Sequence, residues 1–149
     1  MATKYGTAYA KFIAVPQLLV KLNEWGGKLR ACVLEYILAG DATDPNNGDT
    51  IYFGRIPKGA RVFPGWAAWG DIGAAGATLQ LGIVGDTDRY SAALDISAAG
   101  SSVTIASTAA LFAGEELSAD VIVIGTCAGG DWDGAAATFF RGCIPYVLD

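Results

Sequence analysis

The feature that most constrains the fold of this sequence is a series of short β-forming segments, separated by turn residues, between positions 49 and 90. Within residues 77–84 every second side chain is apolar, namely Ala77, Leu79, Leu81 and Ile83. A period of two residues buries one face of a β-strand and leaves the other face to solvent. Residues 50–56 and 60–68 are rich in β-branched and aromatic side chains, which pleated sheets favour. Strands, not helices, are therefore predicted here.

Turn residues predict how these strands are connected. In Ile56-Pro57-Lys58-Gly59 the proline stands second and the glycine fourth, which is typical of a type I turn. We therefore expect a hairpin between residues 50–56 and 60–68. Gly85-Asp86-Thr87-Asp88 predicts the turn after residues 77–84, with its carboxylates accepting hydrogen bonds from nearby backbone N–H groups.

The same signals recur along the rest of the chain. Residues 29–39 are apolar on both faces, which predicts a central strand. Further strands are predicted at residues 89–96, 103–105, 119–126 and 137–147. About eight strands with scarcely any helical segment predict an all-β, single-domain antiparallel β-sandwich that is jelly-roll-like.

The first 27 residues form a segment of their own before the sandwich of residues 28–149. Leu18 and Trp25 share a helical face behind Pro16, whereas the residues from Phe12 to Val15 look extended, so both conformations stay open. The segment is either the opening strand of the core or an extended arm that docks on a neighbour. If it docks, its expected contact residues are Tyr5, Phe12, Leu18 and Trp25.

Composition limits the partners that the chain can have. Only 17% of the 149 residues are charged and 52% are hydrophobic, against roughly 25% charged in an average domain. Either other chains cover part of the surface, or alanine and glycine inflate the apolar count. The net charge is −5 and the basic residues are scattered, which argues against direct binding of nucleic acid. We also expect no membrane span and no signal peptide.

Residues suited to catalysis or metal binding are scarce. The sequence contains no histidine, so Ser-His-Asp and Cys-His arrangements are impossible. Cys32, Cys127 and Cys143 are too far apart for a Cys-x-x-Cys zinc site and are expected to be buried thiols. Acidic residues 41–49 do not follow the EF-hand order. A pair of carboxylates placed as in a glycosidase remains an alternative. We nevertheless expect that the protein is not an enzyme and that it binds no cofactor or metal.

Two tryptophans invite different predictions. Trp66 lies at a strand end and is expected to pack in the core, whereas Trp132 stands in a loop between two aspartates and is expected to be exposed. An exposed loop tryptophan suits either a protein interface or the stacking of a sugar.

Three pieces of the sequence resemble the head decoration, or capsid cement, proteins of tailed bacteriophages. They are Trp25-Gly26-Gly27 followed by Arg30, the predicted hairpin within residues 48–62, and residues 78–85 leading into Asp88-Arg89-Tyr90. Together they cover roughly a third to a half of the chain. Trp132 and the first 25 positions, apart from Trp25 itself, lie outside this match.

The resemblance implies a capsid-bound β-sandwich, often a homotrimer, that binds the major capsid protein on the outer surface of the virion after synthesis in the host cytoplasm. Such a protein would clamp neighbouring capsomers and would need no cofactor. Two alternatives remain open. One is another virion component, such as a head fibre base, a tail protein or an adaptor, and the other is a carbohydrate-binding module that uses Trp132, Trp66 or Tyr90.

Overall fold

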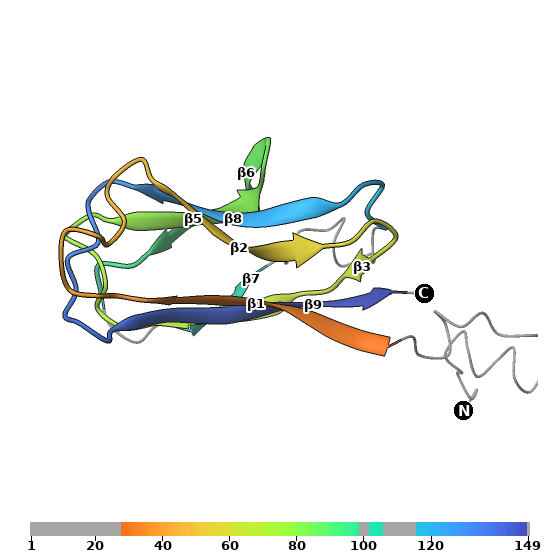
Figure 1. Ribbon diagram of the computed structural model, residues 1–149, viewed down its shortest axis with the longest axis horizontal. Coiled ribbons are helices and arrows are strands. Elements are labelled where there is room, and N and C mark those ends of the chain that lie inside the picture. Colours follow the sequence, from red (N-terminus) through yellow and green to blue (C-terminus); the bar gives the residue numbers. More distant parts are fainter. Residues whose placement is uncertain (1–27, 99–101, 106–115, 149) are drawn as a thin grey trace, which may run out of the picture.

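The computed structural model describes residues 28–98, 102–105 and 116–148, which fold into nine β-strands. Their bounds are β1 (Lys28–Ile37), β2 (Thr50–Ile56), β3 (Arg61–Val62), β4 (Gly65–Trp69), β5 (Thr78–Ile83), β6 (Asp86–Asp95), β7 (Ser102–Ile105), β8 (Val121–Ala128) and β9 (Phe139–Leu148). Two antiparallel sheets pack face to face (Figure 1). Sheet A has the order β1-β9-β4-β7, with β3 also on β9, and sheet B has the order β2-β8-β5-β6. The described part has no helix long and apolar enough to cross a membrane.

Strands β3 and β4 act as one interrupted strand, because both pair with β9. Arg61 of β3 faces Val147, and Trp66 of β4 faces Cys143. The interruption at residues 63–64 lies beside Pro145, where proline supplies no N–H to the ladder. If β3 and β4 count together, the described strands number eight, and their order is that of a jelly roll. The predicted all-β antiparallel sandwich is confirmed.

The connection predicted at Pro57 joins the two sheets and is not a hairpin. Strand β2 lies in sheet B, whereas β3 and β4 lie in sheet A. The Ala60 N–H donates to the Pro57 carbonyl over 3.2 Å. Gly59 has a φ of 82°, so the turn spans residues 57–60 with glycine third, as in type II. The predicted type I hairpin is therefore wrong, since the chain crosses here to cover the core from its other side.

The alternation predicted for residues 77–84 is confirmed in β5 as far as Leu81, beyond which Gly82 is also buried and Ile83 is only half-buried. Ala77, Leu79 and Leu81 are fully buried, and the strand pairs with β6. The following turn is shorter than predicted, because β6 already begins at Asp86 after Gly85, whose φ is 95°. The predicted turn over residues 85–88 is therefore replaced by a tighter one between Ile83 and Asp86, which pair with each other. Within β6, Asp86 forms an ion pair with Arg89 over 3.6 Å.

Strand β1 is an edge strand, although its sequence predicts a central one. It pairs along its whole length with β9 and stands first in sheet A. Cys32 and Leu34 point into the core, but Leu29 and Val33 on the other face are exposed. The two-sided apolar pattern is real, and only one of its faces is covered within this chain.

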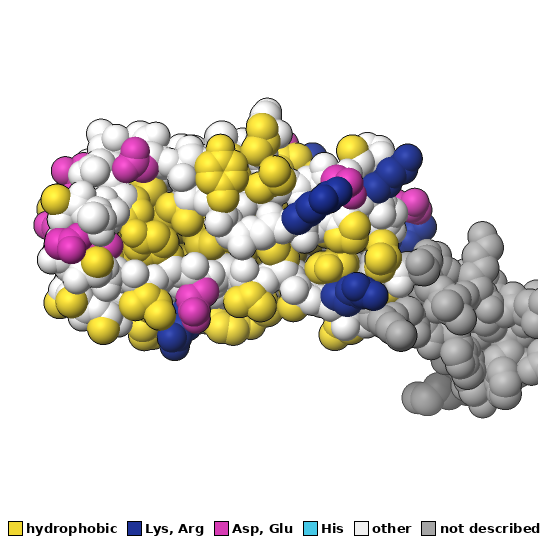
Figure 2. Space-filling view, viewed as in Figure 1, with side chains coloured by type: hydrophobic (Ala, Val, Ile, Leu, Met, Phe, Trp, Pro, Cys, Tyr) yellow, Lys and Arg dark blue, Asp and Glu magenta, His cyan; other side chains and the backbone are white. Residues whose placement is uncertain are grey.

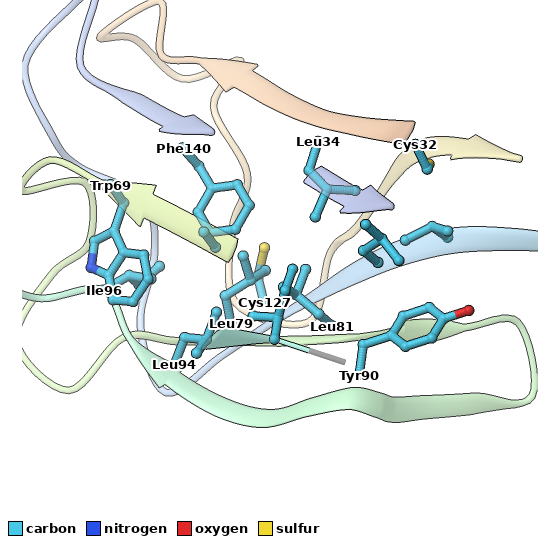
Figure 3. Close-up of a cluster of buried hydrophobic side chains, with 14 of the residues drawn as sticks. Cys32, Leu34, Trp69, Leu79, Leu81, Tyr90, Leu94, Ile96, Cys127 and Phe140 are labelled. Atoms are coloured by element: carbon cyan, nitrogen blue, oxygen red, sulfur yellow. The ribbon is translucent and has the colours of Figure 1, made fainter. Parts of the chain in front are cut away.

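The core between the sheets is apolar and continuous (Figure 3). Phe140 of β9 is fully buried in this core, stacked on Trp69 with ring centroids 6.1 Å apart and tilted against Phe53 at 5.7 Å. All three cysteines are free. Cys32 and Cys127 are buried as predicted, whereas Cys143 is only half-buried. Burial raises the pKa of both buried thiols.

Candidate interaction surface

The outer face of sheet A carries an uncovered group of apolar side chains. Residues that pair in register point to the same side of a sheet. Val33, Cys143 and Trp66 therefore form one row across β1, β9 and β4. Parallel rows on either side complete what we call the apolar face: Leu29, Ala31, Val33 and Ile37 of β1, Phe139, Cys143, Pro145 and Val147 of β9, and Phe63, Trp66 and Ala68 beside them.

This surface is exposed to an unusual degree. The exposed fractions are 71% for Leu29, 63% for Val33, 49% for Ile37, 49% for Trp66 and 37% for Phe63. These are five of the eight large hydrophobic side chains that are exposed in the described residues. Figure 2 shows hydrophobic side chains along the lower side of the molecule, below β1 and β9. A solvated sheet face is normally polar, so a contiguous apolar face indicates an interaction surface.

The charges on this face cancel one another. The Arg141 guanidinium donates through Nε to Glu35 over 2.8 Å, from β9 to the paired position on β1. The same guanidinium lies 4.8 Å from the centroid of the Phe139 ring, a cation–π contact. At the end of the face Arg61 pairs with Glu116 over 3.0 Å. Charged groups are thus already paired before any partner arrives.

The loops at one end of the sandwich carry a separate group of carboxylates, seen as magenta at the left of Figure 2. Asp44, 5% exposed, accepts hydrogen bonds from the backbone N–H groups of Ala39 and Gly40 at 2.9 and 2.7 Å. The Thr43 hydroxyl and then its backbone N–H hold the pKa of Asp41 below its usual value. These carboxylates organise loop backbone, and the described residues contain no group of three side chains placed to hold a metal ion.

Trp132 and Trp66 exchange the positions predicted for them. Trp132 is only 4% exposed and meets Tyr36 edge to face at 5.4 Å. Its loop folds back over the end of the sandwich, where the Trp132 N–H donates to the Pro45 carbonyl over 2.9 Å. The predicted exposure of Trp132 is wrong, so its buried side chain gives no support to the predicted interface role. Trp66 alternates outward on β4 and is exposed, not buried.

The other predicted interface residues, Tyr5, Phe12, Leu18 and Trp25, lie outside the described residues. The three side chains of the sugar-binding alternative do not share one surface, because Tyr90 and Trp132 are buried and Trp66 is exposed. Sequence reasoning missed the apolar face itself. Residues 29–37 already showed a second apolar face in the sequence. The prediction of a central strand assumed that other strands of this chain cover that face.

No family model matches this chain, and no curated protein matches it. Three solved structures do match it. A chain in "Capsid of Ralstonia phage GP4" matches with a TM-score of 0.65 and 24% identity over 83% of this chain and 86% of that one. A chain in "Cyanophage Pam1 capsid asymmetric unit" matches with a TM-score of 0.61 and 17% identity, over 89% of this chain and 93% of that one.

The third is "Acidic stable capsid structure of Helicobacter pylori bacteriophage KHP30", with a TM-score of 0.55 and 13% identity over 83% of this chain and 90% of that one. Each alignment takes in most of both chains, so the matched chains are of similar length and have this fold nearly throughout. This chain therefore has the fold of chains present in three bacteriophage capsid structures.

Proposed function

We propose that this chain is a structural protein of a phage virion that binds the outer surface of the capsid and stabilises it by bridging capsomers. The observation that carries the proposal is the match of 83–89% of the chain to chains in three phage capsid structures. Those chains are about as long as this one, since 86–93% of their length is covered. A single small sandwich suits a component added to a shell.

Physical chemistry favours bridging as the mode of action. A protein that clamps neighbouring subunits needs a stiff scaffold and an uncovered contact surface, and the jelly roll with its apolar face has both. Several weak contacts made at once give a much higher combined affinity than one contact alone. The partner in this proposal is the major capsid protein, and the bound form is a homotrimer at the capsid surface. Residues 1–27 are proposed to contribute an arm that docks on the shell.

The direct test is cosedimentation of the purified full-length chain with phage heads that lack it. We expect saturable binding at a fixed number of copies per capsomer, together with heads that open at a higher temperature once the chain is bound. Deleting residues 1–15 should weaken binding, and undiminished binding would contradict the role of the arm.

A related alternative is another place in the virion, such as a head fibre base, a tail protein or an adaptor. Electron microscopy of particles carrying gold-labelled chain distinguishes the two. Label spread over the head supports decoration, whereas label confined to the vertex or tail would contradict it. Absence of the chain from purified particles would refute a virion role altogether.

A further inference from the structure

The apolar face of sheet A is built like the inner face of a sandwich, and we infer that a second copy of this chain covers it. Val33, Cys143 and Trp66 occupy adjacent positions across three strands. Apolar rows of this kind line the inner faces of packed sheets, where a second sheet lies about 10 Å away. On this face one row differs, because it holds the ion pair of Glu35 with Arg141. Contact between two identical faces is two-fold, so it joins two copies through a surface separate from the contacts within the homotrimer proposed on the capsid, and it does not depend on capsid binding.

The size of the face agrees with a stable contact between copies. Ten residues of β1 at about 3.3 Å each, and three strands about 4.8 Å apart, give a surface of roughly 450 Å². A stable interface buries about 800 Å² on each partner, with an apolar centre and a polar rim. The apolar face thus supplies more than half of that area, and the flanking loops and strand ends supply a rim.

Charge removes the main obstacle to self-association. The full chain has a net charge of −5, so two copies repel each other in general. On the apolar face, however, Glu35 and Arg141 neutralise each other within one chain. Most of the remaining carboxylates of the described residues lie in loops, and Asp41 and Asp133 lie close together where the loops after β1 and β8 meet. Two such faces can therefore meet with the charges of Glu35 and Arg141 already paired within each chain.

The same composition favours a copy of the chain over a partner that arrives later. Interfaces of separately folded, exchanging partners are only about as apolar as ordinary surface, whereas interfaces between identical subunits are markedly more apolar. Leu29, Val33 and Trp66 would also promote aggregation if they stayed uncovered. A second copy is present from synthesis onward, so it can cover them at once.

The test compares two valines of equal exposure. Val33 lies on the apolar face and is 63% exposed, and Val84 lies in the β5–β6 turn of sheet B and is 62% exposed. We expect light scattering of the full-length chain to give a multiple of its 15.4 kDa mass. Val33→Glu should weaken association at least 100-fold, and Val84→Glu should leave it unchanged. Circular dichroism and thermal melting establish that both variants are folded, and Trp66→Ala provides a second disruption without added charge.

Cys143 provides an independent readout, because it lies in the same row as Val33 and Trp66. In the assembled wild type its thiol should be protected from a disulfide reagent at pH 8. In Val33→Glu one thiol per chain should react, while Cys32 and Cys127 stay buried in the core.

Three results would overturn self-association through this face. They are a monomeric wild type at tens of micromolar, an assembly unaffected by Val33→Glu and Trp66→Ala, or equal dissociation by Val84→Glu. Cosedimentation of the same variants with phage heads separates the two proposals. A monomeric wild type whose head binding is lost in Val33→Glu would mean that the shell covers this face. Assembly lost in Val33→Glu, with no head binding by any variant, would support the face and contradict the proposed function.

Discussion

Asp44 fixes the loop between β1 and β2 from a nearly buried position. Its carboxylate accepts the backbone N–H groups of Ala39, Gly40 and Asp41 and lies 3.4 Å from the Tyr36 hydroxyl. A buried carboxylate is stable only where such donors replace water. The Asp44 side chain therefore supplies the acceptors that these backbone N–H groups would find on a neighbouring strand in a sheet.

Removing this carboxylate should be costly. We expect Asp44→Ala to lower the free energy of unfolding by about 3 kcal/mol, because several backbone donors lose a charged acceptor. Urea unfolding followed by tryptophan fluorescence measures the change. The control is Asp71→Ala, which removes an exposed aspartate from a neighbouring loop. Equal losses in the two variants would contradict this role of Asp44.

We expect the buried thiol of Cys127 to make the fold sensitive to alkaline pH. Burial, followed by the nearby charge of Asp49, raises the pKa of this thiol from 9.0 to about 12. The folded state therefore retains a proton that the unfolded chain releases above about pH 9. The associated stability is complete below pH 9 and is lost as the pH rises toward 12, at about 1.4 kcal/mol per pH unit.

Unfolding free energies measured between pH 8 and 10.5 test this linkage. The wild type should lose stability with rising pH more steeply than Cys127→Ala, which starts lower because of the cavity it leaves. A shallower slope remains in the variant, since burial also raises the pKa of Cys32. Parallel curves for the two proteins would argue against titration of Cys127.

At the scale of elements, the interrupted β3 and β4 strand depends on close backbone contact with β9. A Cβ added at Gly65 would meet the carbonyl oxygen of Cys143, so only glycine fits there. Gly65→Ala should lower the free energy of unfolding by about 2 kcal/mol or more, measured by urea unfolding. Gly130→Ala is the matched control, because its added Cβ has no neighbour nearer than 3.4 Å. A similar loss at both glycines would show that the β4–β9 contact is more tolerant than its geometry indicates.

For individual strands, some properties could be predicted from the sequence and others could not. The period of two in residues 77–84 identified β5 correctly, because burial of one face is a local property of the strand. The turn at Pro57 was equally clear, yet a turn does not determine whether the next strand pairs with the previous one or joins the opposite sheet. The two apolar faces of β1 were visible as well. Periodicity records that a face is apolar and carries no information about which chain covers it.

At the scale of the whole molecule, the sandwich class followed from strand spacing, but the pairing partners did not. Strand β1 pairs with β9, so Lys28 faces Leu148 although nearly the whole described chain separates them. Local patterns contain no signal for such distant partners. The predictions for Trp66 and Trp132 were wrong for the same reason. Strands and loops far away in sequence determine whether each side chain is exposed or buried.

The pairing of Lys28 with Leu148 also determines how the sandwich responds to force. The two ends of the described core lie together at one end of the molecule (Figure 1). Hydrogen bonds of an antiparallel pair run perpendicular to the strands, so tension that separates these two points opens the β1–β9 ladder one pair at a time. Tension along the strands loads the whole ladder at once. The molecule is therefore mechanically weak between its ends and strong along its length.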